Sequence, residues 1–86
     1  MASYKLLIKS SAAEELEGLP RKDRSRIVEK IAALAEHPRP PGSEKLSGEE
    51  KYRLRQGDYR VLYSIQDASG TVTVVKIGHR REVYRR

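Results

Sequence analysis

The chain of 86 residues contains no cysteine, tryptophan or phenylalanine, and only one methionine. Without cysteine it can form no disulfide bond, no thiolate metal site and no thiolate nucleophile, which suits a reducing cytosol. The longest apolar run near the N-terminus, residues 6–8, is far too short for a signal peptide or a membrane span. We therefore expect a cytoplasmic protein with a core of Leu, Ile, Val, Ala and Tyr.

Positive charge is concentrated in the second part of the chain. Residues 1–50 carry nine Lys or Arg and nine Asp or Glu, whereas residues 51–86 carry nine cations against three acids. Seven of those nine cations are arginine, whose planar fork matches the geometry of phosphate. This distribution favours binding to nucleic acid or another polyanion. The alternative is a solvated face that keeps a small protein soluble.

Local patterns predict one α+β domain, residues 1–86, with the element order β-α-α-β-β-β. The predicted strands are residues 3–9, 51–56, 59–66 and 71–77, and the last of these is expected inside the sheet. The predicted helices are residues 11–18 and 19–37, joined as a hairpin that packs on one face of a twisted, mostly antiparallel sheet. Residues 39–43 form a rigid connector, residues 44–50 a polar loop, and residues 78–86 a loop or short helical turn.

Two local signals set the expected helix boundaries. Ser10 or Ser11 is expected to cap the first helix, and Ser11 and Glu14 have the spacing of a capping box. The second helix is expected to stop before Pro38, because proline disfavours helical geometry in the residue that precedes it. Its apolar residues follow helical spacing and predict one buried stripe, formed by Ile27, Val28, Ile31, Leu34 and Ala35.

The stretch from Tyr52 to Tyr63 predicts a tight β-hairpin with its turn at Gly57-Asp58. A two-residue turn places Arg55 opposite Arg60, and strand alternation sends both to one face together with Arg53. The tyrosine, leucine and valine residues between them then face the core. Directly opposed like charges destabilise a sheet unless an anion lies over them. We therefore predict a phosphate clamp, unless acids of the loop, Glu44, Glu49 and Glu50, neutralise these arginines.

Candidate groups also follow the last predicted strand. The imidazole of His79 can exchange a proton near neutral pH, although a purely structural histidine is an equal alternative. Arg80 could stabilise the charge on a phosphate during reaction. Tyr84 could stack on an unpaired base, or instead cover a sheet edge. Two further tail arginines, Arg81 and Arg85, are candidates for phosphate binding.

Most hydrolytic machinery is missing from the sequence. There is no glycine-rich phosphate loop, no Ser/His/Asp constellation and no pair of well-placed acids. Two isolated histidines do not make a metal motif, so we expect neither a metal nor a cofactor. The remaining coherent chemistry is RNA cleavage by the substrate's own 2′-hydroxyl, which needs positioning, charge neutralisation and proton transfer.

Nearly the whole chain resembles the RelE/ParE superfamily of type II toxins, and the RelE-like mRNA interferases within it. The resemblance lies in the sequences at residues 4–8, 45–46, 52–55, 57–63, 77–80 and 83–85, together with Pro38. It implies a metal-independent endoribonuclease that cleaves mRNA in the ribosomal A site and inhibits translation. It also implies a cognate antitoxin that covers the basic surface, besides contacts with mRNA and the ribosome.

On matched positions the resemblance assigns phosphate contact and proton transfer to Arg53 and Arg55, and phosphate binding to Arg60. It implies a catalytic arginine at Arg80 and a substrate-positioning tyrosine at Tyr84. Some relatives carry lysine at the two hairpin positions, but arginine cannot act as a base. We therefore expect electrostatic roles for the arginines. His79, or activation of the 2′-hydroxyl by the phosphate clamp and ribosomal RNA, would replace the base.

Two other functions stay open at this point. A ParE-like inhibitor of DNA gyrase would share the fold without ribonuclease activity, although the Gly-His-Arg and Val-Tyr-Arg sequences near the C-terminus favour the RelE side. A non-catalytic RNA-binding module would explain the basic surface alone.

Overall fold

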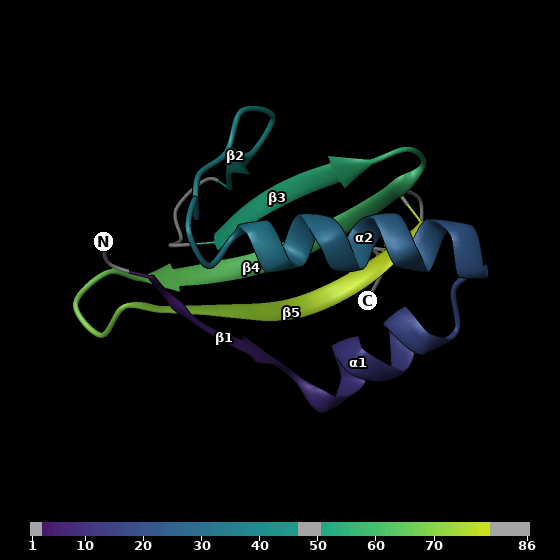
Figure 1. Ribbon diagram of the computed structural model, residues 1–86, viewed down its shortest axis with the longest axis horizontal. Helices are drawn as coiled ribbons and strands as arrows, with labels where there is room; N and C mark the ends of the chain where they lie inside the picture. The colour runs from purple at the N-terminus through teal and green to yellow at the C-terminus, as the bar shows by residue number, and fades with distance from the viewer. Residues whose placement is uncertain (1–2, 47–50, 80–86) are drawn as a thin grey trace.

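The computed structural model describes residues 3–46 and 51–79 and has an α+β architecture (Figure 1). Its elements are β1 (Lys5–Ile8), α1 (Ser10–Glu17), α2 (Arg21–Ala33), β2 (Glu44–Lys45), β3 (Lys51–Gln56), β4 (Tyr59–Gln66) and β5 (Thr71–His79). The strands form one mixed sheet in the order β1-β5-β4-β3-β2. Only β1 and β5 run parallel. The predicted fold class is confirmed, with β2 as an additional short strand inside the predicted loop.

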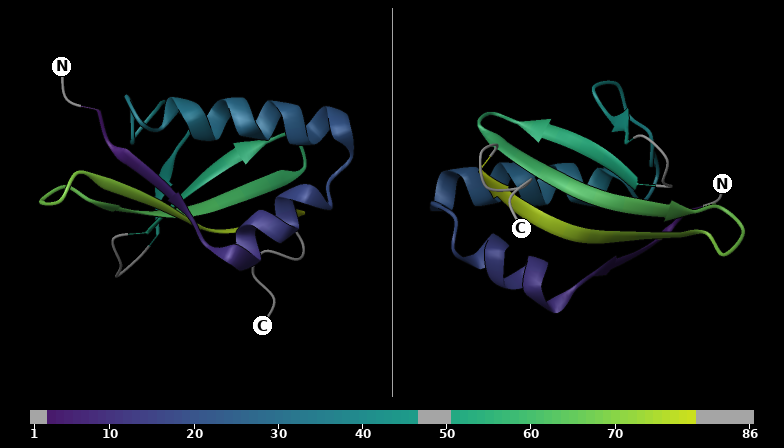
Figure 2. Two further views of the ribbon diagram at one scale, coloured as in Figure 1. Left: turned by 60° about the horizontal axis from the view of Figure 1, so that its bottom comes forward. Right: turned by 180° about the vertical axis from the view of Figure 1, so that it is seen from behind.

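The helices lie on one side of the sheet (Figure 2). α2 crosses the sheet face, and α1 packs beside β5. Ile27, Ile31 and Leu34 of the predicted stripe are buried against the strands, but Val28 is 46% exposed. The stripe is therefore narrower than the sequence predicted. No helix in the described part of the chain combines the length and apolar character needed to cross a membrane.

Both helix boundaries differ in detail from the prediction. α1 begins at Ser10 after Lys9, and no side chain caps its first turn, so the capping box does not form. α2 ends at Ala33 rather than at His37. Beyond Ala33 the chain tightens into three-residue turns, and the carbonyl of Ala35 accepts a 2.7 Å hydrogen bond from the Tyr4 amide. The end of α2 is thus fixed by its contact with the N-terminal segment, which helical spacing cannot reveal.

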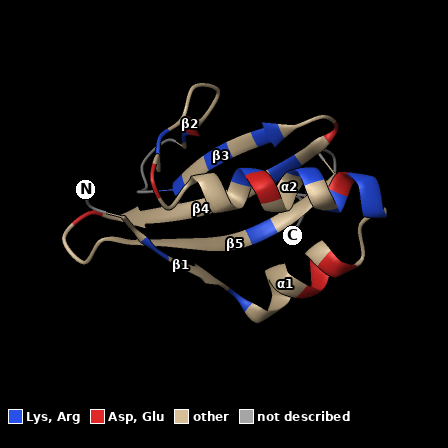
Figure 3. Ribbon diagram, in the orientation of Figure 1, with Lys and Arg blue, Asp and Glu red and all other residues tan. Residues whose placement is uncertain are grey.

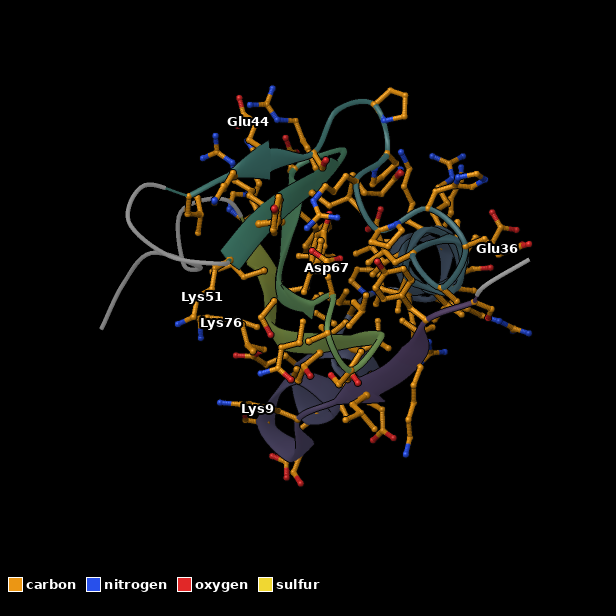
Figure 4. All side chains as sticks on the ribbon, turned by 90° about the vertical axis from the view of Figure 1, so that its left-hand side faces the viewer. Lys9, Glu36, Glu44, Lys51, Asp67 and Lys76 are labelled. Carbon is orange, nitrogen blue, oxygen red and sulfur yellow. The ribbon has the colours of Figure 1, made fainter. Side chains whose placement is uncertain are left out.

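Arg39 joins the connector to the far end of the sheet. Its guanidinium forms two hydrogen bonds with the carboxylate of Asp67, at 2.9 and 3.4 Å, and one of 3.0 Å with the hydroxyl of Tyr52. The Tyr4 hydroxyl donates to the same carboxylate at 2.7 Å. The Tyr52 ring stacks on that of Tyr63, with 5.7 Å between the centroids. These contacts hold together the segment before β1, the connector and the β4–β5 turn, which carries Asp67 (labelled in Figure 4).

Replacing Asp67 with asparagine should lower stability at neutral pH and weaken its dependence on pH in acid. The Arg39 guanidinium, and then the Tyr4 hydroxyl, hold the pKa of Asp67 below its usual range. This stabilisation is present above the unfolded-state pKa of about 3.9 and is lost as the pH falls through the lower folded-state pKa. Urea unfolding of both proteins between pH 7 and pH 2 measures the difference. An equal loss of stability at every pH would contradict the ionic role.

Candidate nucleic-acid interface

The β3–β4 hairpin has the register that the sequence predicted. Its turn contains Gly57, which adopts a φ of 59° at the first turn position, where a side chain would be strained. Arg55 lies opposite Arg60 in the ladder, and Arg53 lies opposite Leu62. Strand alternation then places all three arginines on the face that turns away from the core.

Two lysines extend this basic face across the sheet. Lys51 precedes the arginines on β3, and Lys76 of β5 pairs with Leu62, so both share the outer face by register. Figure 3 shows basic residues on β3, β4 and β5, and Figure 4 shows Lys51 and Lys76 on the side away from α2. We call the residues Lys51, Arg53, Arg55, Arg60 and Lys76 the basic face; Lys76, at its border, forms an ion pair with Glu15 of α1. It offers an extended surface to a polyanion.

The arginines of the basic face differ in burial. Arg60 is only 8% exposed, and its guanidinium donates a 3.2 Å hydrogen bond to the carbonyl of Tyr59. Arg55, directly opposite, is exposed. Arginine keeps its charge even where it is buried. The face therefore combines a cation held in place by the protein with a neighbouring cation in solvent.

Glu44 brings a carboxylate to the edge of the basic face. It lies opposite Arg53 in the β2–β3 ladder, and the Arg53 guanidinium forms an ion pair with its carboxylate. This contact holds the pKa of Glu44 below its usual range, and the charges of Arg55 and Arg60 lower it further. The alternative that a loop acid pairs with an arginine is thus realised for Arg53. The other two acids considered, Glu49 and Glu50, lie outside the described residues.

A cavity of about 410 Å³ opens beside this pair. Its cationic groups are Lys30 of α2, Arg53 and Arg55, and Glu44 is its acid. The remaining lining residues are Pro41, Gly42, Ser43 and Leu54. An excess of cations over acids in a concave site is suited to a phosphate group, which arginine binds through charge-assisted hydrogen bonds.

His79 does not lie with the arginines. It pairs with Tyr59 at the end of β5, and the two rings meet edge to face with centroids 5.9 Å apart. Its neighbour Gly78 pairs with Arg60. Because successive strand residues alternate, the His79 ring lies on the helix side of the sheet and the Arg60 side chain on the other side.

The remaining predicted site residues, Arg80, Arg81, Tyr84 and Arg85, lie outside the described residues. Within residues 3–46 and 51–79, no group of three or more His, Asp or Glu side chains is placed to hold a metal ion. Sequence reasoning named Glu44 only as one of three loop acids that could neutralise the arginines, and it did not name Lys30, which lines the same cavity. The only signal for Glu44 was its position in an acidic loop before the hairpin, and the pairing with Arg53 requires the fold.

Known proteins share both the sequence and the fold. Residues 6–84 match the family model described as the ParE toxin of the type II toxin-antitoxin system parDE. Toxin RelG of Mycobacterium tuberculosis is 31% identical over 96% of this chain and 98% of its own length. Toxin RelE of the same organism is 33% identical over 95% of this chain and 87% of its own length.

Solved structures give the same assignment. A chain of the archaeal RelE–RelB complex from Pyrococcus horikoshii has a TM-score of 0.83 at 29% identity, covering 93% of this chain and 98% of that chain. A chain of the RelBE2 toxin–antitoxin complex from M. tuberculosis has a TM-score of 0.80 at 28% identity, covering 92% of this chain and all of that chain. The protein therefore belongs to the ParE toxin family of type II toxin–antitoxin systems, within the RelE/ParE superfamily.

Proposed function

We propose that this toxin is a ribosome-dependent endoribonuclease that cleaves mRNA in the ribosomal A site and so inhibits translation in the cytoplasm. The observation that carries the proposal is the opposed pair of Arg55 and Arg60 on the hairpin. Arg55, together with Arg53, also lines the cavity beside Glu44. The cavity is lined by the cations Lys30, Arg53 and Arg55 against the single acid Glu44, and such an excess of positive charge suits a phosphate group. We take this phosphate to be that of RNA, because the sequence resembles the RelE-like mRNA interferases.

The proposed chemistry uses the substrate's own 2′-hydroxyl. Its oxygen forms a bond to the adjacent phosphorus as the bond from phosphorus to the 5′-oxygen breaks, giving a 2′,3′-cyclic phosphate and a 5′-hydroxyl. Arg55 and Arg60 would stabilise the charge that develops on the phosphate oxygens. Neither can accept the proton of the 2′-hydroxyl, because arginine stays protonated. This route requires no metal and no cofactor.

Glu44 is the described group best placed to accept that proton. Its carboxylate lines the same cavity as Arg53 and Arg55 and, with its lowered pKa, is ionised at neutral pH. A low pKa makes it a weak base, so the arginines would supply most of the rate. His79 would need to reach around the sheet to serve this role. Arg80 and Tyr84 stay proposed contacts to the phosphate and to a base, and Arg81 and Arg85 stay proposed phosphate contacts.

A cognate antitoxin is the proposed protein partner. The structures similar to this chain include toxins in complexes with RelB, from an archaeon and from M. tuberculosis. An antitoxin that covers the basic face would neutralise it and block access of RNA. The basic face would then bind the RNA and the antitoxin at different times.

Primer extension on mRNA from cells that express the chain tests the ribonuclease proposal. Cuts within translated codons, which also appear when the purified toxin is added to purified ribosomes on mRNA, are expected. A ParE-like gyrase inhibitor is the second candidate, because the matching family model is named for ParE. Inhibited DNA supercoiling without mRNA cuts would favour that function. Retention of RNA without cleavage or gyrase inhibition would indicate an RNA-binding module.

A further inference from the structure

A second cavity, of about 480 Å³, lies at the hairpin end of the molecule on the helix side of β5. It is lined by Tyr59 and His79, and by Leu19 and Pro20, which connect the two helices. The lining is completed by Glu15, Gly18, Lys76, Ile77 and Gly78. Its volume falls in the range typical of small-molecule sites, about 300–1,000 Å³.

The walls of this cavity suit a flat ring. Tyr59 and His79 meet edge to face at 5.9 Å, and both rings line the space. Leu19 and Pro20 add apolar surface to the lining. Nucleic-acid-binding proteins hold unpaired bases on tyrosine and histidine side chains in this manner, largely independently of sequence.

The polar groups of the cavity suit the edge of a base rather than a phosphate. β1 pairs with β5 only as far as Val74, and beyond it the amide of Ile77 donates to the Glu15 carboxylate at 2.9 Å. The Lys76 ammonium pairs with the other oxygen of Glu15 at 3.0 Å. This pair cancels its own charge, so the cavity lacks the cationic excess of the basic face. The carboxylate still has acceptor capacity for an amino group of a base.

The cavity and the basic face meet on β5, where Lys76 belongs to both. Gly78 lines the cavity and is also the ladder partner of Arg60. Neighbouring strands lie about 4.8 Å apart, so the cavity begins one strand away from the proposed phosphate contact. Glycine carries no side chain that could separate the two. Arg60 and the cavity thus lie beside the same short stretch of β5, on its two faces.

We propose that this cavity binds an unpaired nucleobase of the RNA, next to the nucleotide whose phosphate contacts Arg60. The inference rests on the proposed function for the nature of the polymer. It gives His79 a role in holding a base, in place of the proton transfer that the sequence suggested. Tyr59 shares that role, and Glu15 reads the hydrogen-bonding edge of the base.

Nucleotide titration followed by NMR tests the proposal, because the chain contains only two histidines, His37 and His79. The probes are adenosine 5′-monophosphate, cytidine 5′-monophosphate and ribose 5-phosphate, none of which the toxin can cleave as an RNA chain. Both nucleotides should shift the imidazole signals of His79 but not those of the exposed His37, at the other end of α2. Ribose 5-phosphate, which lacks a base, should leave His79 unshifted.

Variants of the full chain provide the quantitative test. His79→Ala and Tyr59→Leu should each weaken nucleotide binding by roughly five- to 150-fold, the range typical of stacking on one aromatic side chain. Binding of ribose 5-phosphate should not change, and His37→Ala should have no effect on either ligand. A loss of less than fivefold in both cavity variants, or an equal His79 shift with ribose 5-phosphate, overturns the proposal. Since no probe is cleaved, these results are independent of whether the chain cuts mRNA.

Discussion

Replacing Arg55 with alanine is expected to lower the rate of mRNA cleavage by about 10²–10³-fold, the usual effect of removing one donor that stabilises a developing charge. Arg55 is exposed and lies across the ladder from Arg60. Its removal opens no cavity in the core, so the free energy of unfolding should stay within about 0.5 kcal/mol of the wild type. Single-turnover cleavage on programmed ribosomes and urea unfolding measure the two effects.

Two companion variants make this prediction specific. Arg26→Ala removes the same charge from an exposed position on α2, and it should leave cleavage within a few-fold of wild type. Arg60→Lys keeps a cation at the buried position but loses the planar fork, so cleavage should fall while folding is retained. Full cleavage by both Arg55→Ala and Arg60→Lys would rule out the phosphate clamp. If Arg26→Ala lowered the cleavage rate as much as Arg55→Ala does, the loss would reflect the overall charge of the protein and not a specific contact of Arg55.

The hairpin could be predicted from the sequence because its determinants are local. Gly57 and Asp58 define a two-residue turn, and alternation around them fixes which residues face the core. Tyr52, Leu54, Val61 and Tyr63 are all buried as the pattern requires. The opposed arginines follow from the same register. This part of the candidate site needed no information beyond neighbouring residues.

The side on which His79 lies could not be predicted in the same way. The β4–β5 ladder shifts by one residue between Leu62 and Tyr63, which leaves Val75 as an extra residue on β5. Strict alternation from Val74 would place Lys76 toward the helices and His79 with the arginines. The bulge moves the side chains of Lys76 and His79 to the opposite faces, because one extra residue shifts every later side chain to the other side of the sheet. A valine-rich strand carries no sequence signal for such a bulge.

The short strand β2 was missed for a related reason. Two charged residues, Glu44 and Lys45, show neither alternation nor β-branched side chains, and their pairing with β3 depends on where the connector returns the chain. The connector is held by Arg39 through contacts with Asp67 and Tyr52. The carboxylate at the basic face is thus positioned by residues distant in sequence, and only the fold brings it to Arg53.

Replacing Glu44 with glutamine tests whether its carboxylate accepts the proton of the 2′-hydroxyl or only neutralises Arg53. If the carboxylate accepts the proton, the substitution should lower kcat by about 10²-fold. This is the low end of the effect of general-base catalysis, because the lowered pKa of Glu44 makes its carboxylate a weak base. The glutamine amide can still accept a hydrogen bond from Arg53, so the hairpin should keep its geometry. Removing a negative charge from a cationic cavity should at the same time leave RNA affinity equal or higher.

The pH dependence of cleavage distinguishes the two roles further. The wild-type rate should fall in acid as Glu44 becomes protonated, at a pH below the usual carboxyl pKa of about 4.3, and Glu44→Gln should lack this fall. Glu36→Gln provides a matched control, because Glu36 is an exposed acid away from the basic face (Figure 4). If Glu44 only neutralises Arg53, Glu44→Gln will bind RNA more tightly and cleave at least as fast as wild type. That outcome would leave the arginine clamp intact and assign the proton to a group of the ribosome or of the RNA.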